Sequence, residues 1–166
     1  MTRPPVNLTK VGRNNRTVFR YIKLDPEERS INPNSDLLLS AFHDVSRESG
    51  FYNLSLTTGK LSQLTMGKYH YGSPIKARAA NQLLCTRENF QEFPDLWVSD
   101  LSIRNPRRIT DANPQMKDYF WGSVELVKWV SLDNVPLEGL LYKPENFDPT
   151  KRYPMIVNFY EKSSEG

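Results

Sequence analysis

Short runs of apolar and β-favouring residues recur between Thr17 and Leu101, and turn-forming residues separate them. This pattern is typical of strands joined by tight turns. The runs occupy residues 17–23, 37–42, 51–56, 82–86 and 96–101. Only residues 44–49 and 114–119 suit a helical turn, because no segment has enough periodic apolar positions for a long helix. The sequence therefore predicts a mainly β chain.

Within these strands the sequence repeats at a shift of 45 residues. Residues 36–65 align with residues 81–110 without a gap, and each unit reads as an apolar strand, a polar connection and an aromatic-led strand. The alignment pairs Leu38 with Leu83, Leu39 with Leu84 and Tyr52 with Trp97. Short strands at a period of about 40–50 residues are typical of propeller blades, because a single blade cannot bury both of its faces. The repeat predicts a partial β-propeller of about two to three C-terminal blades in residues 1–113. Chance similarity between two β-meanders is the alternative.

The character of the sequence changes after residue 113. Residues 124–130 alternate between apolar and polar, and residues 137–142 return after a turn, which predicts a hairpin. Residues 153–160 form a nearly continuous apolar run, typical of a strand that is buried on both faces of an α/β sheet. We expect residues 114–166 to hold a domain junction and the first strands of an α/β-hydrolase sheet, truncated before a crossover helix.

Three short motifs stand in this junction. They are Ile109-Thr110-Asp111-Ala112-Asn113-Pro114, Trp121-Gly122 before the hairpin, and Lys151-Arg152-Tyr153-Pro154 at the last apolar run. Their order and spacing resemble the passage from propeller to hydrolase domain in the prolyl oligopeptidase family, particularly its dipeptidyl-peptidase-like and acylaminoacyl-peptidase-like bacterial members. The resemblance covers residues 36–160. It implies a serine peptidase in which a propeller caps an α/β-hydrolase domain and admits short peptide substrates.

The catalytic residues that such a peptidase needs are absent from this chain. Acyl transfer on this fold uses a Ser in a Gly-x-Ser-x-Gly turn, followed along the chain by an acid and a His. The 166 residues contain no Gly-x-Ser-x-Gly, and the only histidines, His43 and His70, precede the expected hydrolase strands. We therefore expect both histidines to be structural or solvated, and the chain by itself to be inactive.

One further residue of the resembled family has a counterpart here. In that family a Tyr at the end of the strand corresponding to 153–160 offers its hydroxyl to the oxyanion, and Tyr160 stands at that place. The family usually continues Tyr-Gly-Gly-Pro, whereas this chain continues Glu161-Lys162-Ser163. Half-buried packing is therefore the second interpretation of Tyr160, since a Tyr often closes an apolar strand in that way.

Composition bears on the remaining classes of function. The chain has 22 Lys and Arg against 19 Asp and Glu, and its net charge of +3 does not favour a nucleic-acid partner. Basic residues gather before Asp25, where a solvated surface and a basic binding face both stay open. No run approaches the roughly 20 apolar residues that span a bilayer. We expect no metal and no cofactor, because no ligand spacing or phosphate-binding glycine loop is present.

Cysteine and leader patterns say little about the compartment. Cys85 is the only cysteine, so no internal disulfide can form, and its apolar neighbours indicate a small buried hydrophobe. No apolar segment of a signal peptide follows Met1, which leaves the localisation open between cytoplasm and periplasm.

Two functions from different classes remain. The first is a serine peptidase whose last blades, domain junction and one oxyanion donor lie in this chain. The second is a non-catalytic interaction module, either a propeller that binds partners or a hydrolase-like protein without a triad. In both cases interrupted sheets leave strand edges unpaired, so we expect the chain to self-associate. The tryptophans Trp97, Trp121 and Trp129 are expected at core and interdomain positions.

Overall fold

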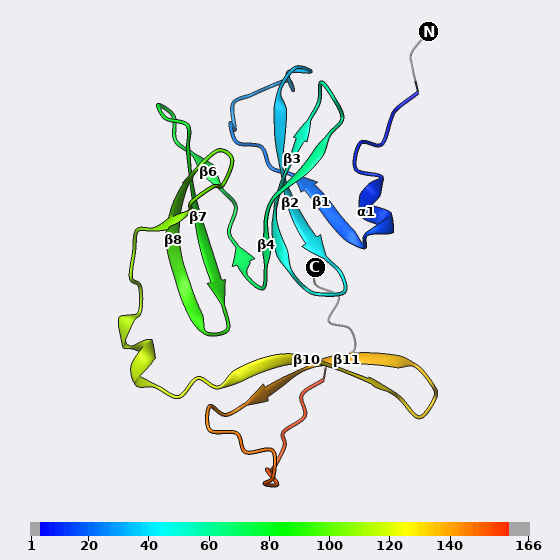
Figure 1. Cartoon of the computed structure of the whole chain (residues 1–166), viewed down its shortest axis with the longest axis vertical. Coiled ribbons are helices and arrows are strands. Elements are labelled where there is room, and N and C mark those ends of the chain that lie inside the picture. Colours follow the sequence, from blue (N-terminus) through cyan, green and yellow to red (C-terminus); the bar gives the residue numbers. More distant parts are fainter. Residues whose placement is uncertain (1–3, 160–166) are drawn as a thin grey trace. The chain divides into compact units, whose positions relative to one another are not determined.

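The computed structural model describes residues 4–159. The described chain is mainly β, with three antiparallel sheets, few helical residues and no closed barrel (Figure 1). It divides into two compact units, Met1–Ala112 and Asn113–Gly166. The expected identities of these units, propeller blades in the first and hydrolase strands in the second, stay predictions.

Four antiparallel strands in sequential order form the first sheet. They are β1 (Thr17–Tyr21), β2 (Asp36–His43), β3 (Ser49–Ser55) and β4 (Leu61–Gly67), and the short helix α1 (Val11–Asn14) precedes them. The sequence predicted the first three strands. It missed β4, whose apolar residues are separated by polar ones, and α1, which is too short to show a period. The helical turn predicted for 44–49 is limited to one backbone bond of helical type, from the N–H of Arg47 to the carbonyl oxygen of His43 at 2.9 Å, and no helix forms between β2 and β3.

The second sheet is also antiparallel, and its strands follow the chain order from residue 82 onward. Its centre is the hairpin of β7 (Gln82–Asn89) and β8 (Glu92–Asp100), and the short β9 (Arg107–Arg108) pairs with β8. The two-residue strands β5 (His70–Tyr71) and β6 (Ile75–Lys76) both pair with β7. Both sheets of the first unit are therefore antiparallel meanders.

The core of the first unit lies between its two sheets. Leu38 and Phe51 from the first sheet and Leu83 from the second are buried together. The ring of Phe51 meets that of Tyr71 edge to face, with 5.1 Å between the ring centroids, and Ile103 packs against the same cluster. Because each buried side chain of this size contributes about 1.5–3 kcal/mol, these contacts hold the two sheets together.

The strand pairs β3–β4 and β8–β9 obey the 45-residue shift. Tyr52 of β3 pairs with Gln63 of β4, and Trp97 of β8 pairs with Arg108 of β9. Each residue of the first pair lies 45 positions before its counterpart in the second. Tyr52 and Trp97 therefore occupy equivalent ladder positions, as the alignment predicts.

The register of the hairpin β7–β8 differs by one residue from the register that the alignment predicts from β2–β3. Trp97 pairs with Cys85, whereas the gap-free alignment places it opposite Leu84. The cause is a bulge, because Phe93 and Pro94 of β8 together lie opposite a single residue of β7. Pro has no N–H to donate to a ladder, so a bulge is one of the few places in a sheet that accept it.

This one-residue difference changes which side chains face the core. Successive residues of a strand point to opposite faces, so a shift of one exchanges the faces of aligned residues. The alignment treats Leu38 and Leu83 as equivalent and so predicts that they lie on corresponding faces of their sheets. With the shift of one residue they lie on opposite faces, and both join the core cluster between the two sheets. Cys85 and Arg87 lie on the same face of β7 as Leu83, because they follow it at intervals of two.

The second unit is organised around one long hairpin. β10 (Ser123–Val130) pairs antiparallel with β11 (Pro136–Lys143) along its whole length, which confirms the predicted hairpin. Lys128 forms an ion pair with Glu138 across the ladder, at 2.8 Å. Asn134 in the turn has a φ of 61°, a left-handed conformation that Asn tolerates better than most residues.

The approach to the hairpin depends on a glycine. A 3-10 helix, Pro114–Asp118, confirms the second predicted helical turn. Gly122 follows with a φ of 72°, and a Cβ placed there would lie 2.0 Å from the carbonyl oxygen of Lys143. No other residue type fits both conditions, so Gly122 sets the close approach between the start of β10 and the end of β11.

The strand predicted for 153–160 is not observed. Residues 153–159 adopt no regular secondary structure, and Ile156 and Phe159 are 97% and 88% exposed. A strand buried on both faces needs hydrogen-bonding neighbours and covering helices. Among residues 4–159 no strand pairs with this segment, so its apolar pattern has no sheet to join.

Candidate functional site

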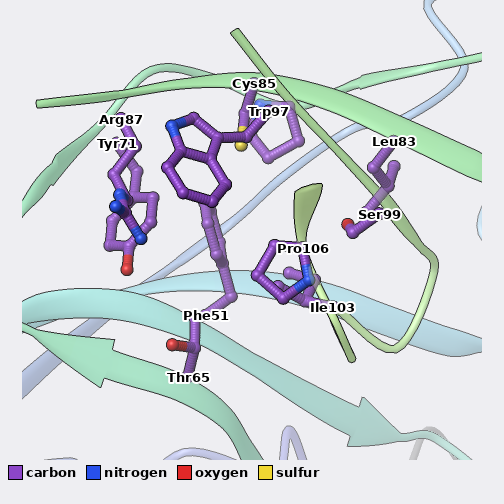
Figure 2. Close-up of a pocket in the computed structure, with 11 residues that line it drawn as sticks. Phe51, Thr65, Tyr71, Leu83, Cys85, Arg87, Trp97, Ser99, Ile103 and Pro106 are labelled. Atoms are coloured by element: carbon purple, nitrogen blue, oxygen red, sulfur yellow. The ribbon is translucent and has the colours of Figure 1, made fainter. Parts of the chain in front are cut away.

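A cavity of about 60 Å³ lies between the two sheets of the first unit (Figure 2). Its walls are mainly aromatic and aliphatic, with a few polar groups. The first sheet contributes Phe51 and Thr65, and the second contributes Tyr71, Leu83, Cys85, Arg87, Trp97 and Ser99. Apolar walls with a small number of placed polar groups are the usual form of a binding pocket, so this cavity is the candidate site.

The guanidinium of Arg87 is held between two aromatic rings. Its central carbon lies 3.7 Å from the centroid of the Trp97 ring and 4.2 Å from that of Tyr69. The Nη2 group donates a hydrogen bond of 2.9 Å to Oε2 of Glu92. Stacking and ion pairing fix the side chain at one end of the cavity, beside Trp97 (Figure 2).

Glu92 is itself held in place by its neighbours. Its carboxylate accepts from the hydroxyl of Tyr69 at 3.2 Å and from the side-chain amide of Asn89 at 3.4 Å. Its backbone N–H donates to Oδ1 of Asn89 at 2.8 Å. A positioned carboxylate therefore neutralises the charge of Arg87.

One donor of Arg87 is left without a partner. Its Nε is the single buried side-chain nitrogen or oxygen in the described part of the chain that has no hydrogen-bond partner. A buried donor of this kind costs free energy, on the order of 1–3 kcal/mol, and calls for an acceptor. Protein atoms cover this nitrogen on all sides, so the cavity is lined by other atoms of Arg87.

The other ionisable groups of the cavity stay neutral near pH 7. Burial raises the pKa of the Cys85 thiol, and the nearby Arg87 offsets this in part. Burial is also the main cause that raises the pKa of Tyr71. A thiol in an apolar setting is a poor nucleophile, because the thiolate is the reactive form. The cavity is therefore suited to binding and not to covalent catalysis.

A second polar cluster lies on β8. Asp95, 5% exposed, accepts from the hydroxyl of Thr110 at 2.6 Å, from the backbone N–H of Ala112 at 2.8 Å and from Nη1 of Arg108 at 3.2 Å. The Thr110 hydroxyl is the largest of the causes that hold the pKa of Asp95 below its ordinary value. All three partners belong to the segment after β8, so this cluster ties β9 and its continuation to the sheet.

A Ser–His contact occurs in the turn between β2 and β3. Oγ of Ser46 lies 2.9 Å from Nδ1 of His43 and donates to Glu48 at 3.0 Å. Nδ1 of His43 already accepts the backbone N–H of Ser46 at 2.9 Å. His43 ends β2 and the other two residues follow it before β3, so their bonds close the turn. This contact is a turn cap, which agrees with the structural role expected for His43, and His70 is exposed on β5.

The other residues singled out from the sequence are not brought together. Tyr160 lies outside the described residues. Trp97 lines the cavity, as a core position requires, whereas Trp121 and Trp129 are 45% and 48% exposed in the second unit. Across residues 4–159, no three His, Cys, Asp or Glu side chains gather as metal ligands, and no helix has the length and apolarity to cross a membrane.

Comparison with known proteins gives a likeness of fold. No family model and no curated protein matches the chain. Two solved structures of AtxE2 isopeptidase do, one of a variant with Astexin3-dC4 bound and one of the apo form. Both have a TM-score of 0.51, with 17% and 16% sequence identity, and the match covers 92% of this chain. The chain spans about 30% of the length of either isopeptidase. The likeness is therefore one of fold, between this chain and part of the isopeptidase structures.

Sequence reasoning missed the role of Arg87. A charged residue inside an apolar run reads as a strand end, and the predicted strand accordingly stopped at Thr86. The intervals of two from Leu83 through Cys85 to Arg87 were a signal that all three share one face. What the pattern could not show is that Trp97 lies over the guanidinium, because the bulge in β8 decides that face.

Proposed function

We propose that this chain is part of a serine peptidase that cleaves short peptides. Its first unit would supply blades of a β-propeller, and its second unit the junction to an α/β-hydrolase domain. The observation that carries the proposal is the likeness to an isopeptidase over 92% of the chain. The junction motifs in residues 109–157 point to the same architecture, because they resemble the prolyl oligopeptidase family.

In this proposal the chain contributes structure and one catalytic donor. The nucleophile, acid and base belong to the longer protein, and Tyr160 offers its hydroxyl to the oxyanion. Such a donor acts by stabilising charge that develops in the transition state. The reaction needs no cofactor, since the Ser, acid and His of a serine peptidase suffice.

Activity-based labelling tests the proposal. The purified 166-residue chain should not hydrolyse dipeptidyl or aminoacyl reporter substrates above background, and a fluorophosphonate probe should not label it. A protein extended by the coding sequence downstream of Gly166 should contain Gly-x-Ser-x-Gly, then Asp and His, and should be labelled. Stoichiometric labelling of the chain alone would contradict the proposal. Absence of the motif downstream would favour the interaction module instead.

The role of Tyr160 has its own test in the extended protein. Tyr160→Phe should lower kcat about 10²–10³-fold while KM changes little, because the lost hydrogen bond forms in the transition state. Tyr119→Phe, the same change at a tyrosine that is 67% exposed, is the matched control and should leave kcat unchanged. An unaltered kcat in Tyr160→Phe would assign this residue to packing.

A further inference from the structure

The cavity between the two sheets has mainly apolar walls. Phe51 of the first sheet and Leu83 and Trp97 of the second line this space, and Ile103 joins them from the loop after β8 (Figure 2). The polarity, the charge, the backbone and the volume of the site each restrict its occupant. Together they define one chemical class of ligand.

Polarity argues against water as the preferred occupant. The hydroxyl of Ser99 donates to the carbonyl oxygen of Asp100 at 3.0 Å, and the hydroxyl of Thr65 is bonded to Tyr71. A buried water is usually held by two to four polar groups, and apolar cavities stay dry. Since these hydroxyls of the wall are already engaged, an apolar occupant matches the cavity better than water does.

Charge argues against an ionic occupant. Nη2 of Arg87 donates to the carboxylate of Glu92 at 2.9 Å, and the guanidinium lies against the Trp97 ring. Its Nε is covered by protein atoms and offers no donor to the cavity. The thiol of Cys85 is neutral near pH 7, because burial raises its pKa. An ion would lose its hydration here without a free counter-charge, which is costly.

The backbone is strained at one wall of the cavity. Ile103 has a φ of 55°, a left-handed conformation that is exceptional for a β-branched residue. Its N–H donates to the carbonyl oxygen of Asp100 at 3.1 Å, and the carboxylate of Asp100 accepts from the N–H of Arg104 at 3.0 Å. These bonds hold the loop, and the Ile103 side chain packs against the core cluster beside the cavity. Strained residues of this kind concentrate at ligand clamps and active sites.

The volume limits the size of the ligand. An apolar cavity of about 150 Å³ can hold benzene, whereas a buried water needs only about 10–15 Å³. The volume here, about 60 Å³, lies between these limits. We propose that the cavity binds a small neutral apolar group of about three to four carbon atoms, such as an isopropyl group, against Leu83, Trp97 and Ile103. The site does not depend on the peptidase function proposed above.

Titration of the chain with cyclopropane, a small neutral hydrocarbon, tests this site. The readouts are the methyl resonances of Leu83 and Ile103 and the indole N–H resonance of Trp97. All should shift saturably, with a Kd on the order of 1–10 mM for a ligand of this size. The methyl resonances of Leu39 and Leu54, which are buried on the far face of the first sheet, should not respond. Ethanol has as many heavy atoms but should bind about fivefold more weakly or less, because its hydroxyl would lose hydration.

Variants of the walls separate this cavity from the surface. Ile103→Asn suits the left-handed backbone but places an amide in the wall, and should weaken cyclopropane binding about fivefold or more. Ile75→Asn, the same change at an isoleucine that is 67% exposed and outside the cavity, is the matched control and should bind within about twofold of the parent chain. Ser99→Leu fills the cavity and should abolish binding. Cys85→Leu fills it from the neighbouring strand and repeats this test if Ser99→Leu does not fold.

Several results would overturn the proposal. The parent chain gives one of them directly: no saturable shift of the Leu83, Ile103 and Trp97 resonances with cyclopropane. Equal affinities for ethanol and cyclopropane would show that the site does not select apolar groups. A long-lived water in the cavity without any response to cyclopropane would make it a hydration site. Unchanged cyclopropane affinity in a folded Ser99→Leu chain would place the binding elsewhere.

Discussion

Asp95 is the one buried charged residue in the described part of the chain. Both oxygens of its carboxylate accept hydrogen bonds, so replacing the carboxylate affects several bonds at once. In Asp95→Asn the remaining oxygen can still accept from Thr110, but the new NH₂ group faces the guanidinium of Arg108, donor against donor. We expect the midpoint of thermal unfolding to fall by roughly 5–10 °C at pH 7. Calorimetry or circular dichroism measures this.

A matched aspartate on the same strand is the control. Asp100 accepts from the N–H groups of Ser102 and Arg104, but it is exposed, and Asn makes turn bonds of this kind as well as Asp does. Asp100→Asn should therefore shift the midpoint by less than about 2 °C. Equal effects of the two substitutions would show that the cluster around Asp95 adds nothing beyond a local turn.

The pKa of Asp95 predicts the sign of a pH effect. Because the pKa in the folded chain is lowered from 3.8, mainly by the Thr110 hydroxyl, the stabilisation is fully present above this value. It is lost as the pH falls below 3.8 toward the folded-state value. Unfolding curves between about pH 7 and pH 2 should therefore converge for the parent chain and Asp95→Asn at the acid end. A constant gap across that range would contradict the assignment.

At the scale of elements, the bulge in β8 makes one deletion tolerable and another not. Removal of Phe93 leaves the pairs on both sides of the bulge intact, since Pro94 alone then lies opposite β7. Removal of Val98 interrupts the regular ladder and exchanges the faces of the residues beyond it. We expect a cost near 1 kcal/mol for the first and about 3 kcal/mol or more for the second.

Unfolding by urea measures both deletions. The fluorescence of Trp97, isolated by Trp121→Phe and Trp129→Phe, reports whether its ring stays against Arg87. This emission should change little without Phe93 and should shift to the red without Val98, as the indole becomes solvated. Equal destabilisation by the two deletions would contradict this prediction, because the fold would then need Phe93 as much as it needs a residue of the regular ladder.

At the scale of the whole molecule, exposed apolar strands predict self-association. Within the described chain β10 and β11 pair only with each other, and Val130, Leu140 and Tyr142 are each about 60% exposed. Open edges beside apolar faces pair readily with other chains. We expect the 166-residue chain to associate at concentrations of about 10–100 µM, as measured by sedimentation velocity.

One substitution in the hairpin distinguishes this surface from general stickiness. Leu140→Lys places a charge in the apolar face of β11 and should weaken association about tenfold or more. Leu132→Lys adds the same charge at the turn, where the leucine is fully exposed and outside both strands, and should have little effect. A parent chain that stays monomeric throughout the concentration range would count against the prediction.

The sequence by itself determined the mainly β character, the hairpin of β10 and β11 and the shared meander of the two sheets. These features follow from short-range rules, since alternation of apolar residues marks a strand and turn residues mark its end. The apolar run of residues 153–159 satisfied the same rules but formed no strand, because a buried strand depends on neighbours that local sequence cannot supply.

Tertiary structure alone decided the candidate site. The alignment of the repeat placed Trp97 opposite Leu84, and the bulge at Phe93 and Pro94 moved it opposite Cys85 instead. That one residue sets the face on which the indole lies, and hence its contact with Arg87. A ladder register is a property of two strands together, so the stacked guanidinium of Arg87 and the cavity that this residue lines arise only when both sheets have packed.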